Sequence, residues 1–345
     1  MIKGIKHVIV YGEPGRFCGW PANSGVWVWG DEILVGFQLG YYREKERDHS
    51  IDRDRSSESV MARSLDGGES WRLERPETLM AGGDPVPCPG GVDFAHSGFA
   101  MACRGPKFFV SYNRGKTWQG PYELPSFGRE LTSRTDYIVN SEDDCLFFLS
   151  AFEAKIEAKL QDRAFCARTQ DGGKTFEFLS WMTPLSPSYR VRSVMPSTVR
   201  VSEDQLVSAL RRRLDSPKPG YPQYWIDAYV SNDNGCTWKL LSKVADTGKH
   251  NGNPPSMVRL RDGRLCVTYG YRATPFGIRA RISDDNGGSW GKEIHLRDDG
   301  RTWDLGYVRT VERLDGKLVT IYYHTTQENP EQHIVATVWD ADLKE

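Results

Sequence analysis

Arginines stand at the ends of several strand-like runs in this sequence. Arg211 and Arg272 each close such a run. A guanidinium group is planar and binds a carboxylate through two parallel hydrogen bonds. Several arginines at the opening of one pocket would therefore suit a carboxylate-bearing ligand. Further polar side chains stand at or just before the start of other strand-like runs: His96, Arg134, Asp136, Arg192, Asn253, Asp304, Tyr307 and Arg309. If these strand ends converge on one axis, their side chains line one pocket.

Each of these residues also has a purely structural interpretation. Tyr307 can be a strand tyrosine whose hydroxyl is satisfied by the protein, and Arg134 can pair with Asp136. Arg211 and Arg272 can be solvated strand ends. The residue types alone therefore leave a binding role and a structural role open.

A short phrase that recurs five times indicates which elements position these residues. Its pattern is Ser/Thr-x-Asp/Asn-x-Gly-x-Ser/Thr-aromatic. An Asp or Asn side chain accepts hydrogen bonds from the backbone that follows, and glycine supplies the positive φ of a tight turn. The aromatic residue then begins the next strand. The five copies span 64–71, 111–118, 169–176, 231–238 and 283–290.

The spacing of the phrases predicts the fold class. Successive copies lie roughly fifty to sixty residues apart, near the length of one four-stranded propeller blade. We expect an all-β, six-bladed β-propeller of four-stranded antiparallel blades, with 1–345 as a single domain. The N-terminal run 6–11 is expected to complete the last blade, beside 307–312, 317–324 and 333–339. Closure of this kind removes exposed sheet edges.

Three further segments are assigned from their sequences. We expect the run 91–96 to be the first strand of the second blade. The insert 42–57 is highly charged and the insert 215–223 is rich in proline. Both inserts are expected in loops on the ligand-binding side, since such loops carry function more often than the scaffold does.

Composition narrows the class of partner. The net charge is −1 and the pI is about 6.7, so no bulk field favours nucleic acid or an anionic membrane. No apolar run reaches the length of a membrane span, and residues 1–7 do not resemble a secretory signal. We expect a cytoplasmic protein, or a secreted one if a signal has been trimmed. The sequence does not fix the oligomeric state.

Metal and disulfide chemistry are not expected. The seven cysteines are scattered and never form a Cys-x-x-Cys pair. His49, His96 and His250 come from different repeats and have no metal-ligand spacing. The sequence therefore predicts neither a metal site nor a cofactor.

The five phrases resemble the Asp box, or BNR repeat, of the sialidase (neuraminidase) superfamily. The segment 305–316 is similar to the sialidase segment in which a tyrosine precedes a strand and an Asp-Gly turn. The resemblance implies that Tyr307 is the nucleophile and that Arg211 and Arg272 are two of the three clamp arginines. It also implies an acid/base aspartate from the charged insert, Asp52 or Asp48. The boxes themselves would be scaffold.

Two departures mark the chain as a divergent member. Gly19-Trp20-Pro21 stands where sialidases have Arg-Ile-Pro, so one clamp arginine is missing. No acid lies near Met195-Pro196-Ser197, where the glutamate that activates the tyrosine is expected. A phenol ionises about three units above neutral pH, so an unassisted tyrosine faces roughly 4 kcal/mol of extra activation. The substrate could then be a uronic acid or another acidic glycan.

Three functions remain open from the sequence. The first is a sialidase-like exo-glycosidase that removes a terminal acidic sugar from a carbohydrate. The second is a polysaccharide lyase, with His96 or His250 as the base beside Arg134 or Arg192. The third is a non-catalytic glycan-binding propeller, for which the missing residues are the natural explanation.

Overall fold

The computed structural model describes residues 4–76, 83–152, 162–185, 191–216 and 218–343. These residues form twenty-four β-strands and one short helix, so the expected all-β class is confirmed. The chain divides into two compact units, which are described separately. The first unit is Met1–Arg75, Thr247–Asp284 and Trp290–Glu345, and the second is Pro76–Asp246 and Asp285–Ser289.

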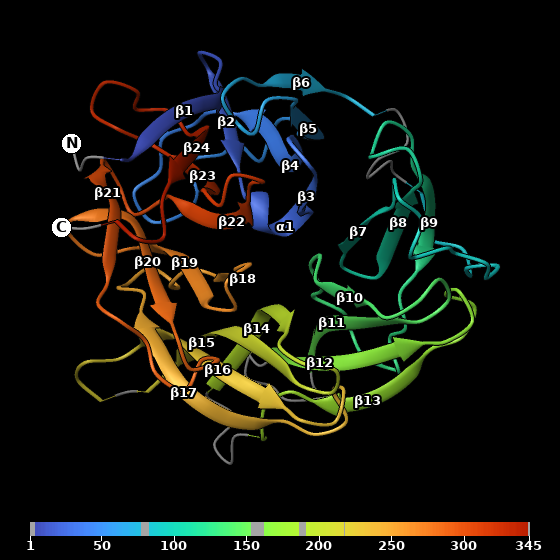
Figure 1. Ribbon diagram of the computed structural model, residues 1–345. Coiled ribbons are helices and arrows are strands. Elements are labelled where there is room, and N and C mark those ends of the chain that lie inside the picture. The colour runs from blue at the N-terminus through green and yellow to red at the C-terminus, as the bar shows by residue number, and fades with distance from the viewer. Residues whose placement is uncertain (1–3, 77–82, 153–161, 186–190, 217, 344–345) are drawn as a thin grey trace. The chain divides into compact units, whose positions relative to one another are not determined.

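The first unit contains three antiparallel sheets (Figure 1). One sheet holds β2 (Arg16–Gly19), β3 (Val26–Trp29), β4 (Glu32–Tyr41), β5 (Glu58–Ser64) and β6 (Arg72–Glu74). The next holds β18 (Ser256–Arg259), β19 (Leu265–Tyr271), β20 (Phe276–Ser283) and β21 (Ile294–Gly300). The last, in strand order, holds β1 (Lys6–Tyr11), β24 (His333–Trp339), β23 (Leu318–His324) and β22 (Gly306–Glu312).

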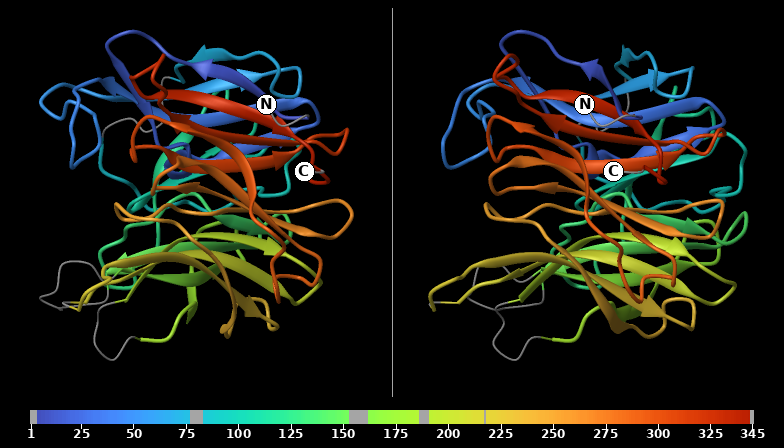
Figure 2. Two further views of the ribbon diagram at one scale, coloured as in Figure 1. Left: turned by 90° about the vertical axis from the view of Figure 1, so that its left-hand side faces the viewer. Right: turned by 60° about the vertical axis from the view of Figure 1, so that its left-hand side comes forward.

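The N-terminal strand completes the last of these sheets, as the sequence predicts. β1 pairs with β24 in antiparallel register from Lys6 opposite Val338 to Tyr11 opposite Ile334. The two strands run side by side although they come from opposite ends of the chain (Figure 2). The pairing covers an edge of β24 that would otherwise be open.

The short helix α1 (Pro21–Ser24) and strand β2 are not expected from the sequence. Proline at the start of α1 suits the first helical turn, where no backbone N–H is needed. The helix packs directly on β4 at Gly36, because a Cβ there would lie 2.6 Å from Cβ of Ser24. β2 and β3 pair with different halves of β4, and α1 lies between them in the chain.

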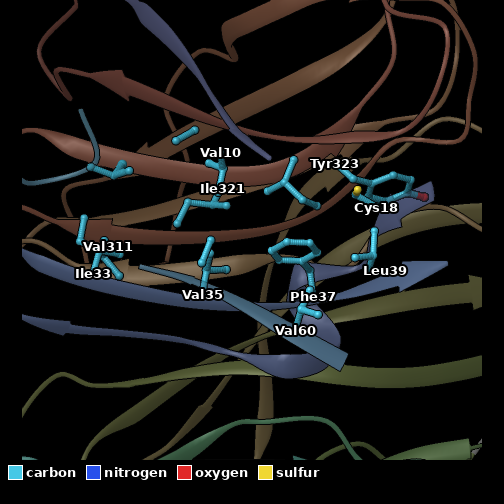
Figure 3. Packing of buried hydrophobic residues seen from close by; sticks show 14 of the residues in the cluster. Val10, Cys18, Ile33, Val35, Phe37, Leu39, Val60, Val311, Ile321 and Tyr323 are labelled. Carbon is cyan, nitrogen blue, oxygen red and sulfur yellow. The ribbon is translucent and has the colours of Figure 1, made fainter. Parts of the chain in front are cut away.

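A core of alternating side chains joins two sheets of the first unit. On β4, Ile33, Val35, Phe37 and Leu39 all point to one face, as the two-residue period of a strand requires. Figure 3 shows them facing side chains of β22 and β23, Tyr323 among them. Their near-complete burial fixes the spacing of the strands that carry the candidate site.

The second unit consists of a three-stranded and an eight-stranded sheet. The smaller holds β7 (Ala100–Arg104), β8 (Lys107–Ser111) and β9 (Gln119–Glu123). The larger holds β10 (Tyr137–Val139), β11 (Cys145–Phe152), β12 (Asp162–Thr169), β13 (Glu177–Trp181), β14 (Val191–Arg200), β15 (Leu206–Leu214), β16 (Gln223–Ser231) and β17 (Lys239–Asp246). A single parallel bridge, Arg163 to Ser193, joins β12 to β14 within it.

The expected strand over 91–96 is wrong. Gly90 and Gly91 both have positive φ, and the Asp93 side chain accepts a hydrogen bond from the Ala95 backbone N–H at 3.0 Å. Both features turn the chain, so this segment is a loop. The charged insert 42–57 lies between β4 and β5, and 215–223 lies between β15 and β16.

The five repeated phrases form turns that share a backbone hydrogen bond to the central Asp or Asn. In the first, the Ser70 backbone N–H and hydroxyl donate to the two carboxylate oxygens of Asp66, at 2.9 and 2.5 Å. The indole N–H of Trp71 donates to the Gly68 carbonyl at 3.0 Å. The central residues of the other four turns accept the corresponding backbone bond: Asn113, Asp171, Asp233 and Asp285.

No helix in the described ranges is long and apolar enough to cross a membrane.

Replacing the turn carboxylate should weaken the fold in a pH-dependent way. Burial raises the pKa of Asp66, but hydrogen bonds from Ser70, Ser64 and the Glu69 backbone together outweigh it and lower the pKa to about 2. A depressed pKa means that the contribution of Asp66 to stability is present above about pH 4 and is lost as the pH falls through 2. We expect Asp66→Ala to lower the free energy of unfolding by about 1 kcal/mol at pH 7.

Urea denaturation at pH 7, 4 and 2 measures this effect, with Glu328→Ala as the control, because Glu328 is exposed in a loop of the same unit. A difference between Asp66→Ala and wild type that persists unchanged at pH 2 contradicts the assignment.

Candidate active site in the first unit

The buried carboxylate of Asp304 is the centre of a hydrogen-bond cluster. Asp304 is 1% exposed and lies just before β22. Its Oδ1 meets Nδ1 of His49 at 2.5 Å and accepts a bond from the Tyr323 hydroxyl at 2.6 Å. Its Oδ2 accepts the Ser50 backbone N–H and the Gln332 side-chain amide, both at 2.9 Å. Burial raises the pKa of Asp304, but these hydrogen bonds outweigh it and hold the pKa below its ordinary value.

The charged insert brings His49 to this carboxylate. An antiparallel bridge between Tyr42 and Ile51 closes the insert at its base. Farther out, the Trp303 indole N–H donates to the Glu46 carbonyl at 3.0 Å. The insert is thus closed on itself at its base and is bonded farther out to Trp303, just before β22.

Aromatic rings surround the imidazole of His49. Its ring centroid lies 5.1 Å from Trp20, 5.6 Å from Trp303 and 6.3 Å from Tyr307, the last in an edge-to-face arrangement. Trp303 also stacks on His250, with centroids 4.8 Å apart and planes 9° from parallel. This collection of rings resembles the lining of a ligand site more than a charged surface loop.

Tyr307 stands on an unusual stretch of backbone. Its φ is +49°, in the left-handed region that a bulky residue rarely adopts. Asn253 is fully buried and bonds to this backbone on both sides of Gly306. Its side-chain N–H donates to the Leu305 carbonyl at 2.9 Å, and its side-chain carbonyl accepts the Tyr307 N–H at 2.7 Å. Gly306 is required between them, because a Cβ there would lie 2.4 Å from Oδ1 of Asn253. Backbone strain of this kind is typically found at functional sites.

The Arg272 side chain lies inside the protein. It has no exposed surface and donates to the carbonyls of Leu305 and His250 at 3.0 and 2.9 Å. It also donates to the Tyr323 hydroxyl at 3.0 Å, and its guanidinium carbon lies 5.6 Å from the centroid of the Tyr307 ring. Arg272 therefore donates to the same Tyr323 hydroxyl that donates to Asp304. The carboxylate-clamp role of Arg272 stays a prediction.

The two aspartates expected to act as acid/base lie elsewhere in the insert. Asp48 contacts Arg53 at 3.3 Å and Lys45 at 3.7 Å. Asp52 contacts Arg43 at 3.4 Å. Both carboxylates thus pair with basic residues of the insert, whereas His49 contacts Asp304. Their catalytic role stays a prediction.

Arg309 and the predicted residues of the second unit have protein partners of their own. Arg309, in the first unit, donates to the Ala22 carbonyl of α1 at 2.8 Å. In the second unit, Arg192 forms an ion pair with the buried Asp162, and Arg134 donates to the Thr132 and Ser133 carbonyls.

The remaining predicted residues of the second unit are also engaged. Asp136 accepts the Thr198 hydroxyl at 2.9 Å, and Arg211 is buried with a 3.6 Å contact to the Met195 sulfur. His96 accepts the Gly98 N–H at 3.0 Å. The ligand-binding roles of these residues stay predictions.

The structure brings four of the predicted residues together in the first unit: Asn253, Arg272, Asp304 and Tyr307. It adds three that the sequence reasoning did not assign to the site: His49, Trp303 and Tyr323. The only sequence signal for His49 was its place in the charged insert, between Asp48 and Asp52. Within the described ranges, no group of three or more His, Cys, Asp or Glu side chains is arranged to hold a metal ion.

Comparison with known proteins shows the fold. No protein-family model matches the sequence, and no curated protein matches it. Among solved structures, the chain is similar to a Dyadobacter fermentans protein of unknown function, with 21% identity and a TM-score of 0.72 over 98% of this chain and 100% of that one.

Two further structures are glycosidases. The alpha-L-arabinanase of Penicillium chrysogenum, complexed with arabinobiose, is 14% identical, with a TM-score of 0.64 over 97% of both chains. The NanB sialidase of Streptococcus pneumoniae is 11% identical, with a TM-score of 0.61 over 98% of this chain and 71% of that one. The chain therefore has a fold like that of propeller glycosidases. These likenesses show the fold and do not show an activity.

Removing the Arg272 guanidinium should destabilise the protein strongly. Arg272→Met keeps a long side chain but leaves two buried carbonyls and the Tyr323 hydroxyl without their donor. We expect the free energy of unfolding to fall by about 3–5 kcal/mol, the usual cost of breaking a buried charged network. Arg259→Met is the matched control on an exposed arginine of β18. Denaturant titration measures the stability of both variants. If Arg272→Met is as stable as wild type but has a raised KM for an acidic sugar, Arg272 is instead a substrate clamp.

Proposed function

We propose that this protein is a sialidase-like exo-glycosidase: a single, six-bladed Asp-box propeller that releases a terminal sugar with Tyr307 as the nucleophile. The fold supports the general class, since an arabinanase and a sialidase share it. One observation carries the assignment of the site. The strained backbone of Tyr307 is clamped by Asn253 and lies beside both His49 and Arg272.

The aromatic rings near Tyr307 suit a carbohydrate. Trp20 and Trp303 are half-buried and flank His49. Sugar rings present apolar C–H faces that pack on aromatic side chains, while their hydroxyls bind polar groups nearby. Such a site holds the sugar in one orientation, so that the anomeric carbon lies near the attacking atom.

A tyrosine nucleophile makes chemical sense for an acidic sugar. A neutral phenol approaches a carboxylate-bearing anomeric centre without the repulsion that a carboxylate nucleophile would meet, and sialidases are the recognised exception to paired carboxylates. We propose an acidic terminal sugar on this ground. Arg272 already donates to the oxygens of His250, Leu305 and Tyr323, and its role as a clamp for that carboxylate remains part of this proposal.

A lyase is the second candidate, and the contact between Asp304 and His49 favours it. A histidine held by a buried carboxylate and placed beside a tyrosine can also abstract the proton next to a uronate carboxyl group. A lyase product carries a conjugated double bond and absorbs ultraviolet light, whereas a hydrolase product does not. One absorbance assay therefore separates the two reactions.

The decisive experiment is a glycan panel assayed with wild type and Tyr307→Phe. The panel contains sialyllactose, an oligouronate and arabinobiose, and released sugar is quantified by chromatography. We expect Tyr307→Phe to lower kcat by about a thousandfold or more on the substrate that wild type cleaves, because the attacking oxygen is missing.

The control is Tyr322→Phe, whose hydroxyl lies in the same sheet and bonds to Thr337 at 2.6 Å. Wild-type turnover in Tyr307→Phe would rule out the nucleophile, and glycan binding without turnover by wild type would favour a binding propeller.

A further inference from the structure

The proposed chemistry requires a base for the proton of Tyr307. A phenol attacks well only as it loses its proton, and phenols ionise near pH 10. The position where the superfamily has its glutamate, near 195–197, holds no acid. Asp48 and Asp52 pair with basic residues of the insert. The base must therefore come from another residue near Tyr307.

We propose that His49, oriented by Asp304, is the base that removes the proton from Tyr307. This inference rests on the function proposed above and assigns a catalytic residue that the sequence did not indicate. Asp304 acts through His49 and is a positioning residue.

The first argument is orientation. The contact of Nδ1 with the ionised Asp304 carboxylate makes Nδ1 the protonated nitrogen, so Nε2 carries the lone pair that accepts a proton. Tyr307 lies edge-to-face against the same imidazole, with centroids 6.3 Å apart. In the described part of the chain, the hydrogen bonds of the His49 ring all involve Nδ1. Nε2 is therefore left for the proton transfer.

The second argument is electrostatic. Once His49 takes a proton it becomes an imidazolium, and the buried Asp304 charge beside it stabilises that form in a medium of low dielectric constant. The other titratable groups that face His49 are Asp48, Tyr307 and Tyr323. Burial and the Asp304 charge raise the pKa of Tyr323 well above its usual range, so this phenol stays protonated and keeps donating to Asp304.

The donors around Asp304 also favour a functional role for His49. Burying a carboxylate costs several kcal/mol unless each oxygen is matched by donors. Four donors converge on Asp304. Among them, His49 is a partly exposed loop residue beside the strained Tyr307.

The step balances as follows. The phenolic proton of Tyr307 moves to Nε2 of His49 as the Tyr307 oxygen forms a bond to the anomeric carbon. The bond from that carbon to the leaving oxygen breaks, and the leaving oxygen takes a proton from an acid on the opposite face of the sugar. In the second step water attacks the anomeric carbon and gives a proton to that same group. The Tyr307 oxygen departs and recovers its proton from His49.

The test is the pH dependence of kcat/KM in His49→Gln. Without the base, only the preformed phenolate of Tyr307 reacts, so kcat/KM should fall about 10²–10³-fold at pH 7. It should then rise about tenfold per pH unit up to pH 9 as more phenolate forms, whereas the wild-type profile should not show this rise. His295→Gln is the matched control, because this exposed histidine of β21 bonds only to acids of its own segment and should keep the wild-type profile.

Asp304→Asn supplies a second variant with the imidazole intact. We expect it to remain folded by circular dichroism and to lose about 10²-fold or more in kcat/KM at pH 7, because the imidazole loses the carboxylate that orients it.

A covalent probe separates failure of this inference from failure of the proposed function. A glycosyl fluoride of the cleaved sugar, with a second fluorine on the ring carbon next to the anomeric carbon, should label Tyr307, detected by mass spectrometry of peptides. Labelling that is equally fast in wild type and His49→Gln at every pH would overturn the role of His49 and leave the function standing. Hydrolysis without labelling of Tyr307 would overturn the nucleophile, and with it this inference.

Discussion

The buried carboxylate of Asp304 is the constraint on which the candidate site depends. A charge removed from water is tolerated only where donors replace the lost hydration, and removing one donor leaves the rest mismatched. Its four donors come from three segments: the insert after β4, strand β23 and the loop before β24. Because each must reach the same two oxygens, satisfying Asp304 also fixes where those segments lie. The insert is held in place by this charge as well as by the burial of Ile51 in the core.

Tyr323 connects this charge to the hydrophobic core. Its ring packs with Phe17 and the alternating residues of β4, while its hydroxyl leaves the core to reach both Asp304 and Arg272. The position of that hydroxyl is therefore set by the packing of two sheets. Since close-packed interiors transmit small displacements, loss of volume in this core is expected to move the donor as well as to lower stability.

Local patterns made most of the fold predictable, and long-range contacts made part of the site unpredictable. Runs such as 6–11 and 333–339 alternate or stay apolar over strand length, and the Asp-Gly phrases carry their turn geometry in their own residues. The prediction of a strand over 91–96 was wrong, because the positive φ of Gly90 and Gly91 and the hydrogen bond accepted by Asp93 turn the chain despite its apolar residues. His49 had no local signal, since its partner lies 255 residues later in the chain. The sequence likewise does not show that the carbonyls of His250 and Leu305 converge on Arg272.

The placement of Tyr307 illustrates how such a site can be rigid and still reactive. A left-handed backbone at a bulky residue costs of order 1–3 kcal/mol and persists only where the surroundings determine it. Asn253 supplies that determination with two hydrogen bonds to the backbone on either side of Gly306. Because the clamp acts on backbone atoms, it positions the phenol without engaging its oxygen. The energy that holds the residue is thus separate from the atom proposed to react, which is what a preorganised nucleophile requires.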